Sequence, residues 1–143
     1  MTTFNTFNDI LREYGEDTTT NFDLIKIAKD LEIPNFHVLM RDELKILNKL
    51  LKDDVSLNVI CNLHTKDEKG IHWSCLHIDN HESYWFDSYA IPPLNRAKNA
   101  HRNYFVFQKS DKKYCGQMCI YVLYKLNNGI SFDDIVIDLY DSI

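Results

Sequence analysis

The stretch that decides the fold is Gln108-Lys109-Ser110-Asp111-Lys112-Lys113-Tyr114-Cys115-Gly116-Gln117-Met118-Cys119-Ile120-Tyr121-Val122-Leu123. A polar loop leads into a largely apolar segment with helical periodicity, and Cys115 stands where the helix begins. Unpaired backbone N–H groups and the helix dipole favour an anion there, so the position suits a thiolate. Glycine is a poor helix former, which indicates that a substrate or a neighbouring backbone approaches closely at Gly116.

Gln108 ends an apolar, strand-like run just before this loop and offers an amide donor. A thiol, a helix N-terminus and an amide donor are the parts of a nucleophilic cysteine site with an oxyanion hole. By itself, a cysteine at the start of a buried helix is more often a small packing residue. The hypothesis of a nucleophile therefore depends on a base and a carboxylate elsewhere in the chain.

Length and composition predict a single domain over residues 1–143, of which 1–20 form a variable N-terminal segment. The chain is 45% hydrophobic and carries 16 Lys and Arg against 21 Asp and Glu, so its net charge of −5 argues against nucleic acid as the principal partner. The four cysteines have no disulfide-rich spacing and no secretory signal precedes them, so we expect reduced thiols inside a cell. No apolar run reaches the ~20 residues that cross a bilayer, so we expect a soluble protein without a membrane partner.

Periodicity of the apolar residues predicts helices at both ends of the chain and strands between them. The expected helices are a short one that ends at Gly15, one capped by Asn21 that stops before Pro34, one capped by Asp42, a polar one over 94–101, one over 115–127 and one from Ser131 to Leu139. The expected strands cover 36–40, 56–63, 71–78, 83–89 and 104–108. This order predicts an α+β domain with a central, mostly antiparallel sheet flanked by helices.

A hairpin between the strands at 71–78 and 83–89 brings a histidine and an aspartate together. A two-residue turn at Asp79-Asn80 places His72 directly opposite Asp87. Opposed side chains on one sheet face are ~5 Å apart at Cβ, within reach of an imidazole–carboxylate hydrogen bond. The carboxylate fixes the imidazole tautomer and favours its protonated form, so Cys115 beside it forms a thiolate–imidazolium pair.

Four further residues complete or shape the expected site. Gln108 and the backbone N–H of Cys115 donate to the oxyanion of a tetrahedral intermediate, and one such donor is worth about 3 kcal/mol. Trp73 roofs the site and positions the ring of His72, while Gly116 admits a close neighbour. Trp85 either packs the sheet or lines the substrate groove.

The chain order His72-Trp73, then Asp87-Ser88-Tyr89 with Pro92-Pro93 after it, then Gln108 upstream of Cys115-Gly116, resembles the adenain-like branch of the cysteine proteases. That family includes the adenovirus maturation proteases and, more distantly, the SUMO and NEDD8 proteases. The segments 21–34 and 41–44 are similar to versions in virophages, Polinton-like elements and other DNA viruses. The resemblance covers roughly residues 18–140.

The resemblance implies an adenain-like fold in which Cys115 is the nucleophile, His72 the general base and acid, Asp87 the orienting carboxylate and Gln108 part of the oxyanion hole. It implies cleavage after small residues such as glycine in capsid or other virion precursor polypeptides, by a monomer in the virion and in the cytoplasm or nucleus of the infected cell. The chemistry requires no cofactor. Adenovirus enzymes are basic and use DNA and a viral peptide as cofactors, whereas the acidic, short chain here supports neither.

Three alternatives remain beside a maturation protease. The same chemistry removes ubiquitin-like modifiers at a C-terminal Gly-Gly, and a non-enzymatic binding module would not need all four site residues. Zinc is the chemical rival, with candidate ligands Cys61, His64, His72, Cys75, His77 and His81. Several of these point to opposite sides of a strand and tight CxxC spacings are absent, so we expect no metal.

Overall fold

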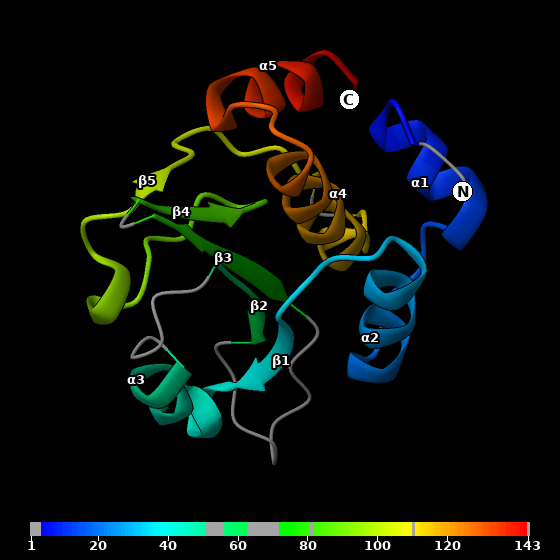
Figure 1. Cartoon of the computed structure of the whole chain (residues 1–143). Helices are drawn as coiled ribbons and strands as arrows, with labels where there is room; N and C mark the ends of the chain where they lie inside the picture. The colour runs from blue at the N-terminus through cyan, green and yellow to red at the C-terminus, as the bar shows by residue number, and fades with distance from the viewer. Residues whose placement is uncertain (1–3, 51–55, 63–71, 81, 110, 143) are drawn as a thin grey trace.

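The computed structural model describes residues 4–50, 56–62, 72–80, 82–109 and 111–142 and has an α+β architecture (Figure 1). Its five-stranded sheet has the order β1-β2-β3-β4-β5. The strands are β1 (Phe36–Met40), β2 (Leu57–Asn62), β3 (Trp73–Asp79), β4 (Glu82–Asp87) and β5 (His101–Arg102). Three residues of the predicted elements lie outside the described residues. They are residue 51 in the helix expected after Asp42, residue 63 at the end of the strand expected over 56–63, and residue 71 at the start of the strand expected over 71–78.

The sheet is mixed rather than mostly antiparallel. Strands β2, β3 and β4 are antiparallel, as predicted, but β1 runs parallel to β2 and β5 runs parallel to β4. A parallel pair needs a connection that returns the chain to the starting end of the sheet. The 3₁₀ helix η1 (Arg41–Ile46) and α3 (Leu47–Leu50) lie in the connection from β1 to β2, and the 3₁₀ helix η3 (Asn95–Ala97) lies in the one from β4 to β5.

Helices cover the two faces of the sheet unequally (Figure 1). On one face α4 (Cys115–Asn127) packs against β3, and α1 (Phe7–Tyr14), α2 (Asn21–Asp30) and α5 (Phe132–Ser142) pack around α4. Every residue of α4 from Cys115 to Leu123 is buried, so this helix forms the centre of the larger core. The opposite face carries a smaller core that includes side chains from η1, α3 and β4.

Helix ends follow local capping signals, and two of the predicted caps are wrong. Thr20, not Asn21, caps α2, because its hydroxyl accepts a hydrogen bond from the Asp23 N–H at 3.1 Å while the Asp23 carboxylate accepts one from the Thr20 N–H at 2.8 Å. At η1 the carboxylate of Glu43 accepts from the Met40 N–H at 3.1 Å, so Asp42 is not the cap. The ends of α1 at Gly15 and of α4 before Gly129, both with positive φ, are confirmed.

The strand predicted over 104–108 is wrong, and the helix predicted over 94–101 is reduced to η3. The edge strand β5 ends at Arg102 because the side chain of Asn103 forms hydrogen bonds with the backbone N–H and carbonyl groups of Asp87. Its Oδ1 accepts from the Asp87 N–H at 3.0 Å and its Nδ2 donates to the Asp87 carbonyl at 2.7 Å. A side chain that occupies these groups leaves no ladder for the following residues to join.

Gly116 allows the N-terminal segment to pack directly on the first turn of α4. A Cβ on this residue would lie well inside van der Waals contact with Thr19 Oγ1, 3.0 Å from Leu24 Cδ2 and 3.2 Å from Trp73 Cδ1. The close neighbours that the sequence predicted at Gly116 are therefore the protein's own side chains, which pack around the N-terminus of α4.

We expect Gly116→Ala to lower the free energy of unfolding by about 1–3 kcal/mol, because the added methyl group overpacks this contact. Thr19 Oγ1 is buried without a hydrogen-bond partner among the described residues, so Thr19→Ala should recover part of the loss in the double variant. Urea unfolding of the four chains of this cycle measures the effect. Strictly additive substitutions would contradict the proposed clash.

Candidate active site

The side chain of Asp87, fully buried at the end of β4, is held by three donors. Its Oδ2 accepts from His72 Nε2 at 2.8 Å and from Ser74 Oγ at 2.5 Å, and its Oδ1 accepts from the backbone N–H of Tyr89 at 2.8 Å. A carboxylate away from water is tolerated only with such partners. The three bonds fix the position of the carboxylate and, through it, the imidazole.

His72 meets Asp87 although the predicted register of the hairpin is wrong by two residues. Ser74, not His72, lies directly opposite Asp87, and the last pair before the turn is Asp79 with Glu82. Side chains alternate along a strand with a period of two, so a shift of two residues keeps His72 on the same face. From its place just before β3, His72 reaches the carboxylate on the diagonal.

The environment of His72 favours the protonated imidazole. Burial alone would lower the pKa of the ring, but hydrogen bonds to Asp87 and Cys115, together with their charges, raise that pKa to about 9. Since Asp87 occupies Nε2, the buried Nδ1, which has no nitrogen or oxygen partner among the described residues, is the atom left to face the thiol. The ring of Tyr89 lies against the imidazole with the centroids 4.9 Å apart.

Cys115 is the first residue of α4 and only 3% exposed. The backbone N–H of Trp73 donates to its sulfur at 3.4 Å, and the thiol of Cys119, one turn along the helix, donates to the Trp73 carbonyl at 3.4 Å. The sulfur of Cys115 therefore has a helix N-terminus, an N–H donor and a protonated imidazole around it. The positive end of the helix dipole and a hydrogen-bond donor thus surround this sulfur.

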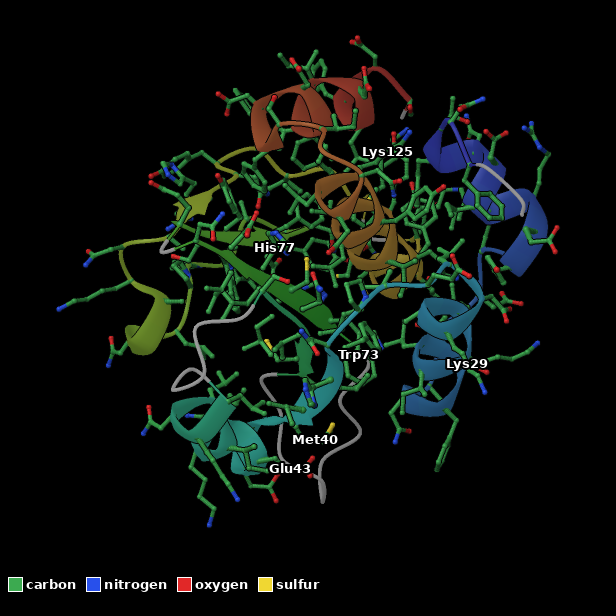
Figure 2. The ribbon with its side chains drawn as sticks, viewed as in Figure 1. Lys29, Met40, Glu43, Trp73, His77 and Lys125 are labelled. Carbon is green, nitrogen blue, oxygen red and sulfur yellow. The ribbon has the colours of Figure 1, made fainter. Side chains whose placement is uncertain are left out.

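Trp73 does not have the place that the sequence predicted, whereas Trp85 takes the first of its two predicted places. Trp73 is 3% exposed and its Nε1 donates to the Thr19 carbonyl at 3.0 Å, so its indole lies in the core (Figure 2) and its backbone, not its ring, contacts the site. Tyr89 is the residue that covers His72 instead. Trp85 is fully buried in the smaller core and donates to the Ile91 carbonyl at 2.9 Å, so it packs the sheet and lines no groove.

Gln108 lies in a loop that is attached to the end of β4. The backbone N–H groups of Phe107 and Gln108 donate to the Ser88 carbonyl at 2.8 and 3.1 Å. The Gln108 side chain accepts from Ser88 Oγ at 2.7 Å and donates from Nε2 to the Lys112 carbonyl at 2.5 Å. An amide nitrogen carries two hydrogens, so one remains uncommitted among the described residues.

Sequence reasoning missed Ser74, Ser88 and Asn103, which hold the functional groups in place. Ser74 carries a signal that period-two alternation reveals, because it lies two residues after His72 on the same face. Ser88 and Asn103 act through contacts between segments that are distant in sequence, and no local pattern marks them.

The other candidate metal ligands do not gather around a common point in the described part of the chain. No group of three or more His, Cys, Asp or Glu residues there has the geometry to hold a metal ion. His64 and His81 lie outside the described residues. Burial raises the pKa values of the Cys61 and Cys119 thiols.

No helix in the described ranges is long and apolar enough to span a bilayer.

We expect the contribution of His72 to stability to be complete below about pH 6.5 and to disappear as the pH rises through about 9, because the folded state binds the proton more tightly than the unfolded chain. The full shift corresponds to roughly 3 kcal/mol, and solvent screening of the partly exposed ring reduces the expected loss to about 2 kcal/mol. Urea unfolding of the wild type and of His72→Gln between pH 6 and pH 9.5 measures the difference. Parallel pH profiles for the two proteins would contradict this assignment.

Comparison of the chain with protein-family models and with curated proteins finds no match. The arrangement of the side chains is therefore the basis for assigning a function. That arrangement places a histidine between a buried carboxylate and a cysteine at a helix N-terminus, with a glutamine amide on the adjoining loop.

Proposed function

We propose that this protein is a cysteine endopeptidase in which Cys115 attacks the scissile carbonyl. The observation that carries the proposal is the position of His72, whose Nε2 is hydrogen-bonded to the buried Asp87 and whose pKa is raised by both Asp87 and the neighbouring Cys115. A nucleophile, a base and a group that orients the base are the three parts of an activated nucleophile. A structural cysteine needs none of them.

The reaction follows from these positions. The Cys115 sulfur forms a bond to the carbonyl carbon, and the oxygen becomes an anion near the N-terminus of α4, where the Cys115 N–H and the second Nε2 hydrogen of Gln108 donate to it. His72 gives its proton to the departing amine, which leaves a thioester. His72 then takes a proton from a water molecule whose oxygen attacks the thioester carbon, and the C–S bond breaks to release the acid product and restore the thiolate beside the protonated His72.

The resemblance in sequence extends the proposal to the substrate and the setting. The sheet with α4 across it is then an adenain-like fold, and the substrates are capsid or other virion precursor polypeptides in the virion and the infected cell. Cys115 is only 3% exposed and Tyr89 lies against the catalytic ring, so little room is left around the sulfur. A site with so little room accepts small residues such as glycine most easily.

We expect iodoacetamide to label Cys115 before the other cysteines between pH 5 and pH 7, with the selectivity lost in His72→Ala. All four cysteines are buried, so exposure alone does not distinguish them and selective labelling reports the activated thiol. Mass spectrometry of digests maps the modified residues. Equal labelling of all four only at alkaline pH would overturn the assignment of the nucleophile. Peptides with internal glycines, compared with conjugates ending in Gly-Gly, then separate endopeptidase from isopeptidase activity.

We expect Gln108→Glu to reduce kcat by about 10²- to 10³-fold with little change in KM, because it removes the N–H donor that acts in the transition state. The substitution keeps the shape of the side chain and the acceptor for Ser88 Oγ. Ser88→Ala is the matched control, since it leaves the amide donor in place. A larger loss in the control than in Gln108→Glu would show that the glutamine only supports the loop.

A further inference from the structure

A cavity of about 360 Å³ lies at the far end of the sheet from Cys115 and His72. Its walls come from the end of β3, the start of β4, β5 and the turn between α4 and α5. The lining residues that matter for its chemistry are His77, Asp79, Tyr84, His101, Phe132 and Asp133. His77 follows His72 by five positions, which corresponds to ~16 Å along a strand. The cavity is therefore separate from the proposed active site.

His77 lines this cavity although the residue is only 4% exposed. Its Nδ1 is bonded to Asn58 Oδ1 at 2.7 Å, and the same oxygen accepts from Asn127 Nδ2 at 2.8 Å. Nδ1 must therefore carry the hydrogen. Burial lowers the pKa of His77, so the ring is neutral and Nε2, which bonds to no described residue, offers a lone pair.

The charged groups at the cavity are acceptors as well. The carboxylates of Asp79 and Asp133 lie at its edge, and none of its described lining residues is a lysine or an arginine. The backbone N–H groups of Gly129 and Ile130 are used within the turn, where they donate to the Leu126 and Lys125 carbonyls at 3.1 Å. The two carboxylates and the acceptor nitrogen favour a cation with several hydrogen-bond donors.

The aromatic walls narrow the choice of cation. Tyr84 stacks on His101 with the centroids 5.2 Å apart and lies 5.6 Å from the ring of Phe132. A guanidinium group is planar, is more weakly hydrated than an ammonium group and carries five donors in a fixed plane. It can therefore lie along aromatic walls while its edge meets a carboxylate and a histidine nitrogen.

We infer that this cavity binds the guanidinium of an arginine side chain presented by another polypeptide. In a peptide the backbone groups around the arginine are neutral, whereas free arginine carries a carboxylate that would meet Asp79 and Asp133. The inference goes beyond the proposed peptidase function, because no catalytic residue takes part in it.

The test is a titration of the whole protein with N-acetyl-arginine amide, followed by NMR of the histidine ring nitrogens. We expect a saturable shift of His77 Nε2, an affinity several-fold weaker for the lysine analogue, and no binding of the neutral citrulline analogue. The double variant Asp79→Asn/Asp133→Asn should bind at least tenfold more weakly. Asp134→Asn is the matched control, because Asp134 also lies in the first turn of α5 but does not line the cavity.

Several outcomes would overturn the inference. They are the absence of a saturable shift at millimolar ligand, equal shifts with the citrulline analogue, and equal losses of affinity in Asp134→Asn and in the double variant. Tighter binding of free arginine than of the blocked amide would refute the polypeptide as the source of the guanidinium. The exposed positions of Asp79 and Asp133 make it feasible to confirm by circular dichroism that the variants are folded.

Discussion

The arrangement of the site depends on the burial of one carboxylate. An unpaired charge inside a protein costs several kcal/mol, so Asp87 must keep its donors whenever the protein is folded. Two of those donors are His72, just before β3, and Ser74, near the start of β3, and the third is the N–H of Tyr89. The backbone of Asp87 is bonded to the side chain of Asn103, which starts the loop that carries Gln108. The positions of His72, the proposed base, and of the loop that carries Gln108 thus both depend on Asp87.

This dependence explains which predictions from sequence succeeded. The helix over 115–127 was predictable because its apolar period and its C-terminal glycine are local signals. The meeting of His72 with Asp87 was predictable because only the parity of the register matters for it, and an error of two residues preserves parity. The strand over 104–108 failed because a run of apolar residues has no information about Asn103, whose side chain ends the pairing.

The residue types indicated that Gly116 and Trp73 are important, but they did not indicate that both residues pack the N-terminus of α4. The glycine is needed where Thr19 and the indole of Trp73 pack on α4, and the Gln117 side chain beside it donates to the Gly15 and Asp17 carbonyls at 3.0 and 2.7 Å. The segment before α2 therefore supports the N-terminus of the helix that carries Cys115, the proposed nucleophile. Because these partners are some 100 positions apart in sequence, only the fold could reveal them.

His72, just before β3, and His77, within β3, show that the groups around a histidine determine whether its pKa is raised or lowered. His72 lies beside a carboxylate and a thiol, which raise its pKa to about 9 despite burial, so it can hold a proton for transfer. His77 lies beside the neutral amide of Asn58, and burial lowers its pKa, so it offers a lone pair. Both rings direct one nitrogen to an oxygen that fixes the tautomer. The same side chain thus suits a proton donor just before β3 and a hydrogen-bond acceptor within that strand.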